Sequence, residues 1–157
     1  MSFPRGAAAK VQGAEENAEL AAALRRVVGG EVRFDSYTRH LFSRDASMYA
    51  IEPIGVVLPR DAADVAAVVS TAGEFDVPVL PRGAGTSLAG QTVGRAIVMD
   101  LSRHMTLIKD IDAERNVARV QPGVVQEQLN LAAARHGLVF GPPPPPLQQD
   151  KRTEITA

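Results

Sequence analysis

Apolar residues in the first two thirds of the chain alternate between helical spacing and short continuous runs. Helical spacing extends over residues 17–28, and again from Asp61, a good N-cap, to about Phe75. A shorter helix is expected at residues 35–42. The continuous runs predict strands at residues 56–58, 77–80 and 96–101. This strand–helix–strand order favours a parallel sheet with a right-handed crossover.

The pattern changes after residue 106. Residues 107–112 and 116–120 read as strands joined by a short polar link, which predicts an antiparallel hairpin. Pro122 and Gly123 then interrupt the strand, and residues 124–136 return to helical spacing. The pattern therefore predicts an α+β fold in which a small parallel sheet with helices is followed by an antiparallel part.

Composition excludes several classes of protein. The 157 residues include 17 basic and 18 acidic side chains, so no basic excess points to nucleic acid. Cysteine is absent, which rules out disulfides and thiolate chemistry and is compatible with the cytoplasm. No apolar stretch is long enough to span a membrane, so any membrane association would be peripheral, through a partner. The three histidines are scattered along the chain, and we expect no metal site.

The chemically most informative stretch is residues 81–90, Pro-Arg-Gly-Ala-Gly-Thr-Ser-Leu-Ala-Gly, which follows the predicted strand at 77–80. Glycines and small hydroxyl residues at the end of a strand expose successive main-chain N–H groups, an arrangement that binds phosphate. Charge-assisted hydrogen bonds contribute about 1.5–3 kcal/mol each, so four or five aligned amides would supply most of the affinity for a diphosphate. The alternative is a glycine-rich turn that only reverses the chain.

Two common phosphate-binding motifs do not fit this stretch. The dinucleotide fingerprint G-x-G-x-x-G would begin at Gly83, but Leu88 stands at its third glycine. A P-loop ending at Gly90 would need lysine where the chain has Gln91, which weakens the case for a nucleotide hydrolase. The interpretation that remains is a loop that binds a nucleotide diphosphate mainly through its main chain.

Three ordered motifs give the chain a family resemblance. Residues 81–90, the preceding Val-Val-Leu-Pro-Arg-Asp-Ala-Ala-Asp-Val at 56–65 and the following Val-Gln-Pro-Gly-Val at 120–124 resemble the FAD-binding domain of the vanillyl-alcohol oxidase / p-cresol methylhydroxylase flavoproteins. The pattern Ser-Arg-Asp-Ala-Ser-Met-Tyr at 43–49 is most similar to the D-lactate dehydrogenase and glycolate oxidase subunit branch. The resemblance covers about residues 32–142 and implies a p-cresol methylhydroxylase-type FAD-binding domain with an incomplete antiparallel subdomain.

The resemblance also implies FAD as cofactor and a set of contact residues. The implied cofactor-binding residues are Pro59, Pro81, Arg82, Gly83, Ala84, Gly85, Thr86, Ser87, Pro122 and Gly123. For Pro59 and the Pro122–Gly123 pair, a purely structural role at a strand end remains open. Asp45, Ser47 and Tyr49 contact either the cofactor or only their neighbours, and we favour the local role. No catalytic residue can be named.

The resemblance implies a flavin-dependent enzyme that oxidises a 2-hydroxy acid and passes electrons to an acceptor subunit or domain. We expect an N-terminal extension with a helix at 1–31, a partial FAD-binding domain at 32–141 and a disordered proline-rich tail at 142–157. Beyond Pro142 the likeness stops abruptly, so we expect a truncated product that lacks the substrate domain. The alternative is a non-catalytic module that binds a nucleotide diphosphate and uses its prolines to contact a partner.

Overall fold

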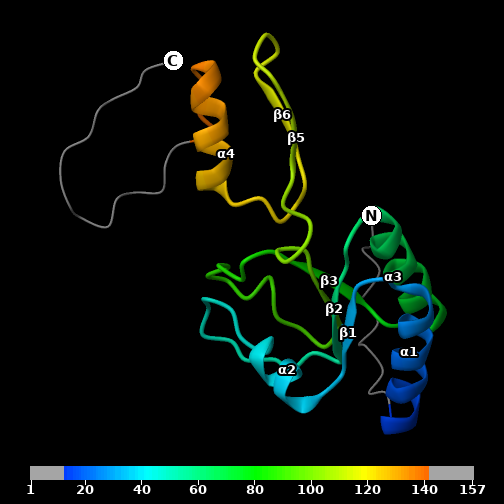
Figure 1. Ribbon diagram of the computed structural model, residues 1–157. Helices are drawn as coiled ribbons and strands as arrows, with labels where there is room; N and C mark the ends of the chain where they lie inside the picture. The colour runs from blue at the N-terminus through cyan, green and yellow to red at the C-terminus, as the bar shows by residue number, and fades with distance from the viewer. Residues whose placement is uncertain (1–12, 142–157) are drawn as a thin grey trace, which may run out of the picture. The chain divides into compact units, whose positions relative to one another are not determined.

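The computed structural model describes residues 13–141, and these form two compact units (Figure 1). The first unit ends at Met105 and the second begins at Thr106. The predicted tail at 142–157 lies outside the described residues, and the predicted boundary at residue 31 stays a prediction.

The first unit is built on a four-stranded sheet in the order β1-β2-β4-β3. Its strands are β1 (Glu31–Arg33), β2 (Gly55–Leu58), β3 (Val79–Arg82) and β4 (Ile97–Asp100). Both β2 and β3 pair with β4 in parallel, which confirms the predicted parallel core. All four residues of β4 are buried, as expected for the central strand.

Two features of this sheet differ from the sequence prediction. The three-residue strand β1, antiparallel to β2, was not predicted, because three residues with two charges show no strand periodicity. Strand β3 begins at Val79 rather than at residue 77, and it contains Pro81. A proline, which has no N–H to donate, is tolerated here because β3 lies at the edge of the sheet.

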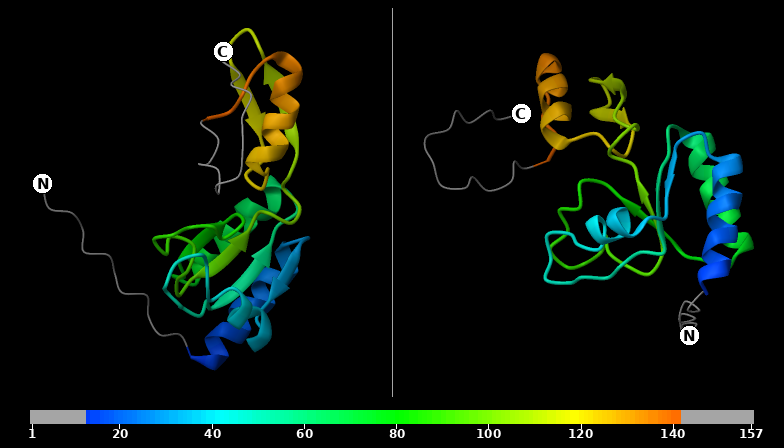
Figure 2. Two further views of the ribbon diagram at one scale, coloured as in Figure 1. Left: turned by 90° about the vertical axis from the view of Figure 1, so that its left-hand side faces the viewer. Right: turned by 60° about the horizontal axis from the view of Figure 1, so that its bottom comes forward.

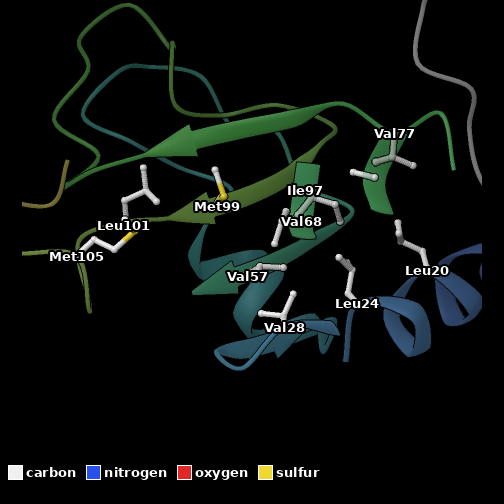
Figure 3. Close-up of a cluster of buried hydrophobic side chains, with 11 residues drawn as sticks. Leu20, Leu24, Val28, Val57, Val68, Val77, Ile97, Met99, Leu101 and Met105 are labelled. Carbon is white, nitrogen blue, oxygen red and sulfur yellow. The ribbon is translucent and has the colours of Figure 1, made fainter. Parts of the chain in front are cut away.

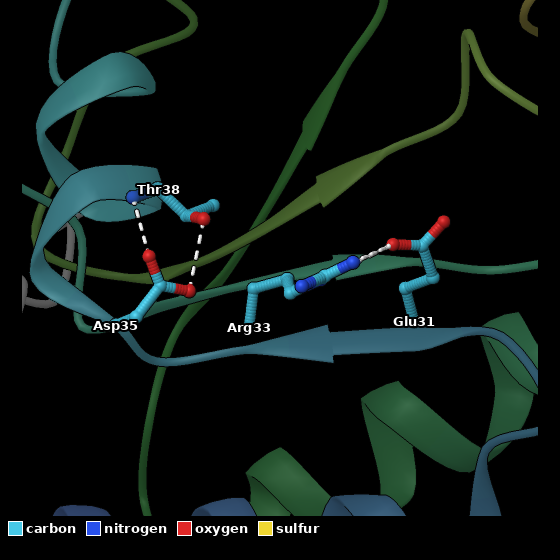
Figure 4. Close-up of polar contacts among 4 residues, drawn as sticks. All are labelled: Glu31, Arg33, Asp35 and Thr38. Atoms are coloured by element: carbon cyan, nitrogen blue, oxygen red, sulfur yellow. Dashed lines mark hydrogen bonds and ion pairs between the residues drawn. The ribbon is translucent and has the colours of Figure 1, made fainter.

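Three helices belong to the first unit: α1 (Ala14–Val27), α2 (Ser36–Leu41) and α3 (Ala62–Glu74). The predicted N-cap of α3 is confirmed, because the Asp61 side chain accepts hydrogen bonds from two main-chain N–H groups of the first turn. Asp35 caps α2 in the same way, accepting from the main chain and the hydroxyl of Thr38 (Figure 4). On the adjoining strand β1, Arg33 forms an exposed ion pair with Glu31 (Figure 4).

The hydrophobic core lies between the sheet and the pair of helices α1 and α3, which run side by side (Figure 2). Leu20 and Leu24 of α1 are fully buried against side chains of α3 and the central strands (Figure 3). Helix α1, predicted as part of an N-terminal extension, therefore contributes to the core of this unit. Fully burying each such leucine contributes about 1.5–3 kcal/mol.

The second unit contains a hairpin and a helix. Strands β5 (Ile108–Asp112) and β6 (Val117–Val120) pair antiparallel, which confirms the predicted hairpin. Helix α4 (Gln126–Ala133) continues into a short 3₁₀ turn (Ala134–His136), and Gly137 ends it in the left-handed conformation. Within residues 13–141, no helix has the length and apolar character needed to cross a bilayer.

Asp64 is a buried carboxylate that ties the end of α1 to the start of α3. Its two oxygens accept hydrogen bonds from the main-chain N–H of Gly29 at 2.7 Å and of Arg60 at 2.9 Å. Burial by itself raises the pKa of Asp64, but the N–H groups of Arg60 and Gly29 outweigh it, so the pKa is lowered. The ionised carboxylate is thus the form that the fold stabilises.

We expect Asp64→Asn to lower the free energy of unfolding by about 1–3 kcal/mol, because an amide cannot accept both main-chain N–H groups and one is left unpaired. Urea unfolding followed by circular dichroism measures the change. Glu74→Gln, at the exposed end of the same helix, is the control and should leave stability within about 0.5 kcal/mol of wild type. Equal losses in both variants would show that Asp64 has no special role.

Candidate functional site

The glycine-rich loop leaves the sheet at the carboxyl end of β3 and returns to β4. Because β2, β3 and β4 are parallel, their carboxyl ends meet at one edge of the sheet, and this edge is where parallel α/β sheets bind ligands. The loop extends from this edge beside the segment 42–50 (Figure 2). The fold therefore places the predicted diphosphate loop where a ligand would reach it.

The main-chain N–H groups at the start of this loop have no hydrogen-bond partner within residues 13–141. They belong to five consecutive residues, Gly83, Ala84, Gly85, Thr86 and Ser87. These residues are exposed or partly exposed. A row of unpaired main-chain donors is what an anionic ligand needs, so the loop fits the diphosphate of a nucleotide.

The two glycines in this row serve different purposes. Gly85 has φ +70°, and a Cβ atom there would lie 2.5 Å from Nη2 of Arg82, so the loop itself requires glycine at this position. A Cβ atom at Gly83 would meet nothing within 4 Å. Gly83 is thus free of any constraint from the fold and leaves open space beside the unpaired donors.

The guanidinium of Arg82 binds the protein's own main chain rather than facing solvent. It donates to the carbonyl oxygens of Phe42, Arg44 and Thr92 at 3.3, 2.8 and 3.2 Å. It also lies 5.2 Å from the centre of the Phe42 ring. The side chain of Arg82 thus holds the loop, and its carbonyl accepts from the N–H of Leu101 at 2.9 Å, so the cofactor contact assigned to Arg82 stays a prediction.

Ser87 and Gln91 close the second half of the loop on itself. The Ser87 hydroxyl donates to the side-chain oxygen of Gln91 and accepts from the N–H groups of Ala89 and Gln91 at 3.3 and 3.1 Å. Gln91, which stands where a P-loop would have lysine, therefore has a structural partner. Thr86 and Ser87 are the two predicted cofactor-binding residues with hydroxyls. Thr86 is exposed, whereas the hydroxyl of Ser87 is already hydrogen-bonded.

Asp45 joins the segment 42–50 to the far end of the loop. Its Oδ2 accepts from the hydroxyl of Thr92 at 2.9 Å and from its N–H at 3.4 Å, while Oδ1 accepts from the N–H of Ser47 at 2.9 Å. Hydrogen bonds from Ser47 and Thr92 lower the pKa of Asp45 to about 2. Tyr49 lies against Gly90, where a Cβ atom would come within 2.6 Å of its ring. The bond from Ser47 to Asp45 is the local contact favoured from the sequence, whereas the contacts of Asp45 with Thr92 and of Tyr49 with Gly90 join distant parts of the chain.

The remaining predicted residues lie in different surroundings. Pro81 is exposed on β3 at the start of the loop, whereas the side chain of Pro59 is fully buried at the end of β2, which weighs against direct contact with a ligand. Pro122 and Gly123 belong to the second unit, where they form a turn between β6 and α4. The cofactor contacts assigned to these four residues stay predictions. Among residues 13–141, no group of three or more histidine or acidic side chains could hold a metal ion.

Gly85→Ala should lower the free energy of unfolding by about 1–3 kcal/mol, because alanine is strained at positive φ and its Cβ displaces Arg82. Urea unfolding without any ligand measures this cost. Gly83→Ala is the matched control, since its Cβ enters open space, and it should be nearly neutral. A loss at Gly83 as large as at Gly85 would contradict the distinction between the two glycines.

The lowered pKa of Asp45 predicts a pH-dependent contribution to stability. A carboxylate with a depressed pKa stabilises the fold above its unfolded value of 3.8, and this contribution disappears as the pH falls towards about 2. Asp45→Asn should therefore destabilise the protein near neutral pH, and the difference from wild type should shrink below about pH 4. Urea midpoints over this pH range test it, with the exposed Glu19→Gln as control. A difference that grew on acidification would contradict the prediction.

Curated relatives of known activity match most of this chain. It is 44% identical over 116 residues to D-2-hydroxyglutarate dehydrogenase of Pseudomonas putida, a match that covers 72% of the chain and 12% of that enzyme. It is 35% identical over 122 residues to glycolate oxidase subunit GlcD of Bacillus subtilis, covering 74% of the chain and 26% of the subunit. The chain thus spans only a small part of the length of these relatives.

Solved structures show the same fold at low sequence identity. A 4-ethylphenol oxidase from Gulosibacter chungangensis matches 83% of the chain and 27% of its own, with a TM-score of 0.67 and 20% identity. p-Cresol methylhydroxylase matches 82% of the chain and 26% of its own, with a TM-score of 0.65 and 21% identity. These matches confirm the predicted p-cresol methylhydroxylase-type α+β fold.

A family model adds the cofactor. The model described as "FAD binding domain" matches residues 53–149, more than half of the chain and the whole glycine-rich loop. The unpaired donors of this loop fit the diphosphate of that cofactor. The chain therefore belongs to the FAD binding domain family, and its cofactor is FAD.

Proposed function

We propose that this chain is the FAD-binding portion of a flavin-dependent oxidoreductase that oxidises a 2-hydroxy acid. The observation that carries the proposal is the row of unpaired N–H groups from Gly83 to Ser87 at the carboxyl edge of the parallel sheet. The relatives support the substrate class, because their names specify D-2-hydroxyglutarate, D-lactate and glycolate. All three of these compounds are 2-hydroxy acids.

In this proposal the protein holds the cofactor mainly through its backbone. The N–H groups of residues 83–87 donate to the diphosphate, and the exposed hydroxyl of Thr86 adds a further donor. Pro81 lies at the start of the loop, and cofactor contacts of Pro59, Pro122 and Gly123 are part of the same proposal. When bound, the flavin supplies the chemistry by accepting a hydride from the carbon that bears the substrate hydroxyl.

Substrate binding and electron transfer are assigned to parts other than the FAD-binding portion. Oxidation of a hydroxy acid by a flavin needs a base near the substrate hydroxyl and a cation for the substrate carboxylate, and we assign neither within the chain. We propose that a separate substrate domain supplies both, and that an acceptor subunit or domain takes the electrons. A cytoplasmic location, peripheral to the membrane only through a partner, is part of the same proposal.

The purified chain, incubated with FAD and desalted, should retain a flavin absorption spectrum. Four or five charge-assisted hydrogen bonds of about 1.5–3 kcal/mol each would support this retention. Retention of ADP but not of FAD would favour the non-catalytic nucleotide-binding module, and Mg²⁺-dependent ATP hydrolysis would favour a P-loop enzyme. A longer protein that includes a substrate domain is the positive control.

Gly83→Leu should abolish retention of FAD without unfolding the protein, because the new side chain fills the open space beside the donors and meets no protein atom at its Cβ. Gly73→Leu is the matched control, since a Cβ there also meets nothing within 4 Å but lies on α3, away from the loop. Fluorescence titration with FAD measures the affinity. Undiminished binding by Gly83→Leu would remove the loop from the cofactor site.

A further inference from the structure

The glycine-rich loop is fastened along its length to the segment 42–50. Arg82 bonds the carbonyls of Phe42 and Arg44, and the Ala46 N–H donates to the Gly85 carbonyl at 3.0 Å. Further along, Asp45 binds Thr92. We propose that Arg82, Asp45 and Thr92, here termed the clasp, are positioning residues whose side chains hold the unpaired N–H groups in place for a diphosphate and do not themselves touch it. This inference rests on the proposed cofactor site.

Thr92 is the point at which the two charged members of the clasp meet. Its N–H and hydroxyl donate to Asp45, and its carbonyl accepts from Arg82. The N–H and the carbonyl of Thr92 are therefore both bound by side chains. The side chain that accepts from the N–H, Asp45, is 47 residues away in the sequence. Thr92 is only partly exposed, so these bonds are partly shielded from water.

Arg82 anchors the other end of the loop. Its forked guanidinium bridges three carbonyls that belong to two separate segments, 42–44 and 92. Its position requires glycine at residue 85, because a Cβ there would overlap Nη2. Lysine carries the same charge but has no planar fork, so it cannot bridge the same carbonyls at once.

The clasp is suited to a site built from backbone donors. Glycine loops lose much conformational freedom when they bind a ligand, and a loop already held in its bound shape avoids that loss. The carboxylate of Asp45 is ionised, and its oxygens accept hydrogen bonds from Ser47 and Thr92, so its hydrogen-bonding capacity serves the loop. The charged side chains of Arg82 and Asp45 can thus shape an anion site although they do not pair with each other.

The test compares the affinities of the wild-type chain and its variants for FAD and for ADP by fluorescence titration and calorimetry. Thr92→Val removes the hydroxyl but keeps the shape, and we expect about tenfold weaker binding of both ligands, the value of one charge-assisted hydrogen bond. Thr92→Ser keeps the hydroxyl and should bind as the wild type does. Arg82→Lys should weaken binding by at least as much as Thr92→Val.

Arg39→Lys is the matched control, because Arg39 also binds a carbonyl, that of Pro53, but at a distance from the loop. It should lower the thermal midpoint of the ligand-free protein and leave both affinities unchanged. Equal affinity of Thr92→Val and wild type, or equal weakening by Thr92→Val and Thr92→Ser, would overturn the clasp alone. If the wild type binds ADP but not FAD, the proposed function fails, and the clasp is then tested by the affinities of the variants for ADP. If it binds neither ligand, both proposals fail.

Discussion

The first unit holds a row of main-chain N–H groups without hydrogen-bond partners, and the contacts around the glycine-rich loop keep this row in place. A folded chain satisfies nearly all of its backbone donors, yet this loop presents five in succession with no acceptor among residues 13–141. They are tolerated because the loop is exposed to water, and they keep one shape because the fold fixes the loop from both sides. The parallel edge strand β3 leads into the loop, and the side chains of Arg82 and Asp45 hold the loop in place.

The same arrangement explains why the charges near the loop do not make it a simple electrostatic site. Arg82 would be the obvious partner for a phosphate, but its guanidinium binds three carbonyl oxygens. Asp45 is an ionised carboxylate, but its oxygens are directed at the protein, where they accept three hydrogen bonds, one from Ser47 and two from Thr92. Charged side chains thus shape the loop, and neutral backbone groups are left to meet the ligand.

Much of the fold could be predicted because its signals are local. Helices α1 and α3 are recognisable by their apolar spacing, and Asp61 is recognisable as a cap from its place before the helix. Strand β1 could not be predicted, since three residues become a strand only by pairing with β2. The burial of α1 against α3 likewise depends on contacts between helices that lie more than 30 residues apart.

The sequence by itself determined the element types, the glycine-rich loop and the family, because these are encoded in residue types at fixed short spacing. Only the tertiary structure decided which polar groups of the site are available. Arg82 and Ser87 were both predicted as cofactor contacts, and the structure shows that the guanidinium of Arg82 and the hydroxyl of Ser87 already have partners within the protein. For Arg82 the physical reason is that a hydrogen bond across about 40 residues depends on where the fold brings the two segments, and local spacing carries no record of it. For Ser87 the partners are only two and four residues away, but they meet the hydroxyl only once the loop has taken its folded shape.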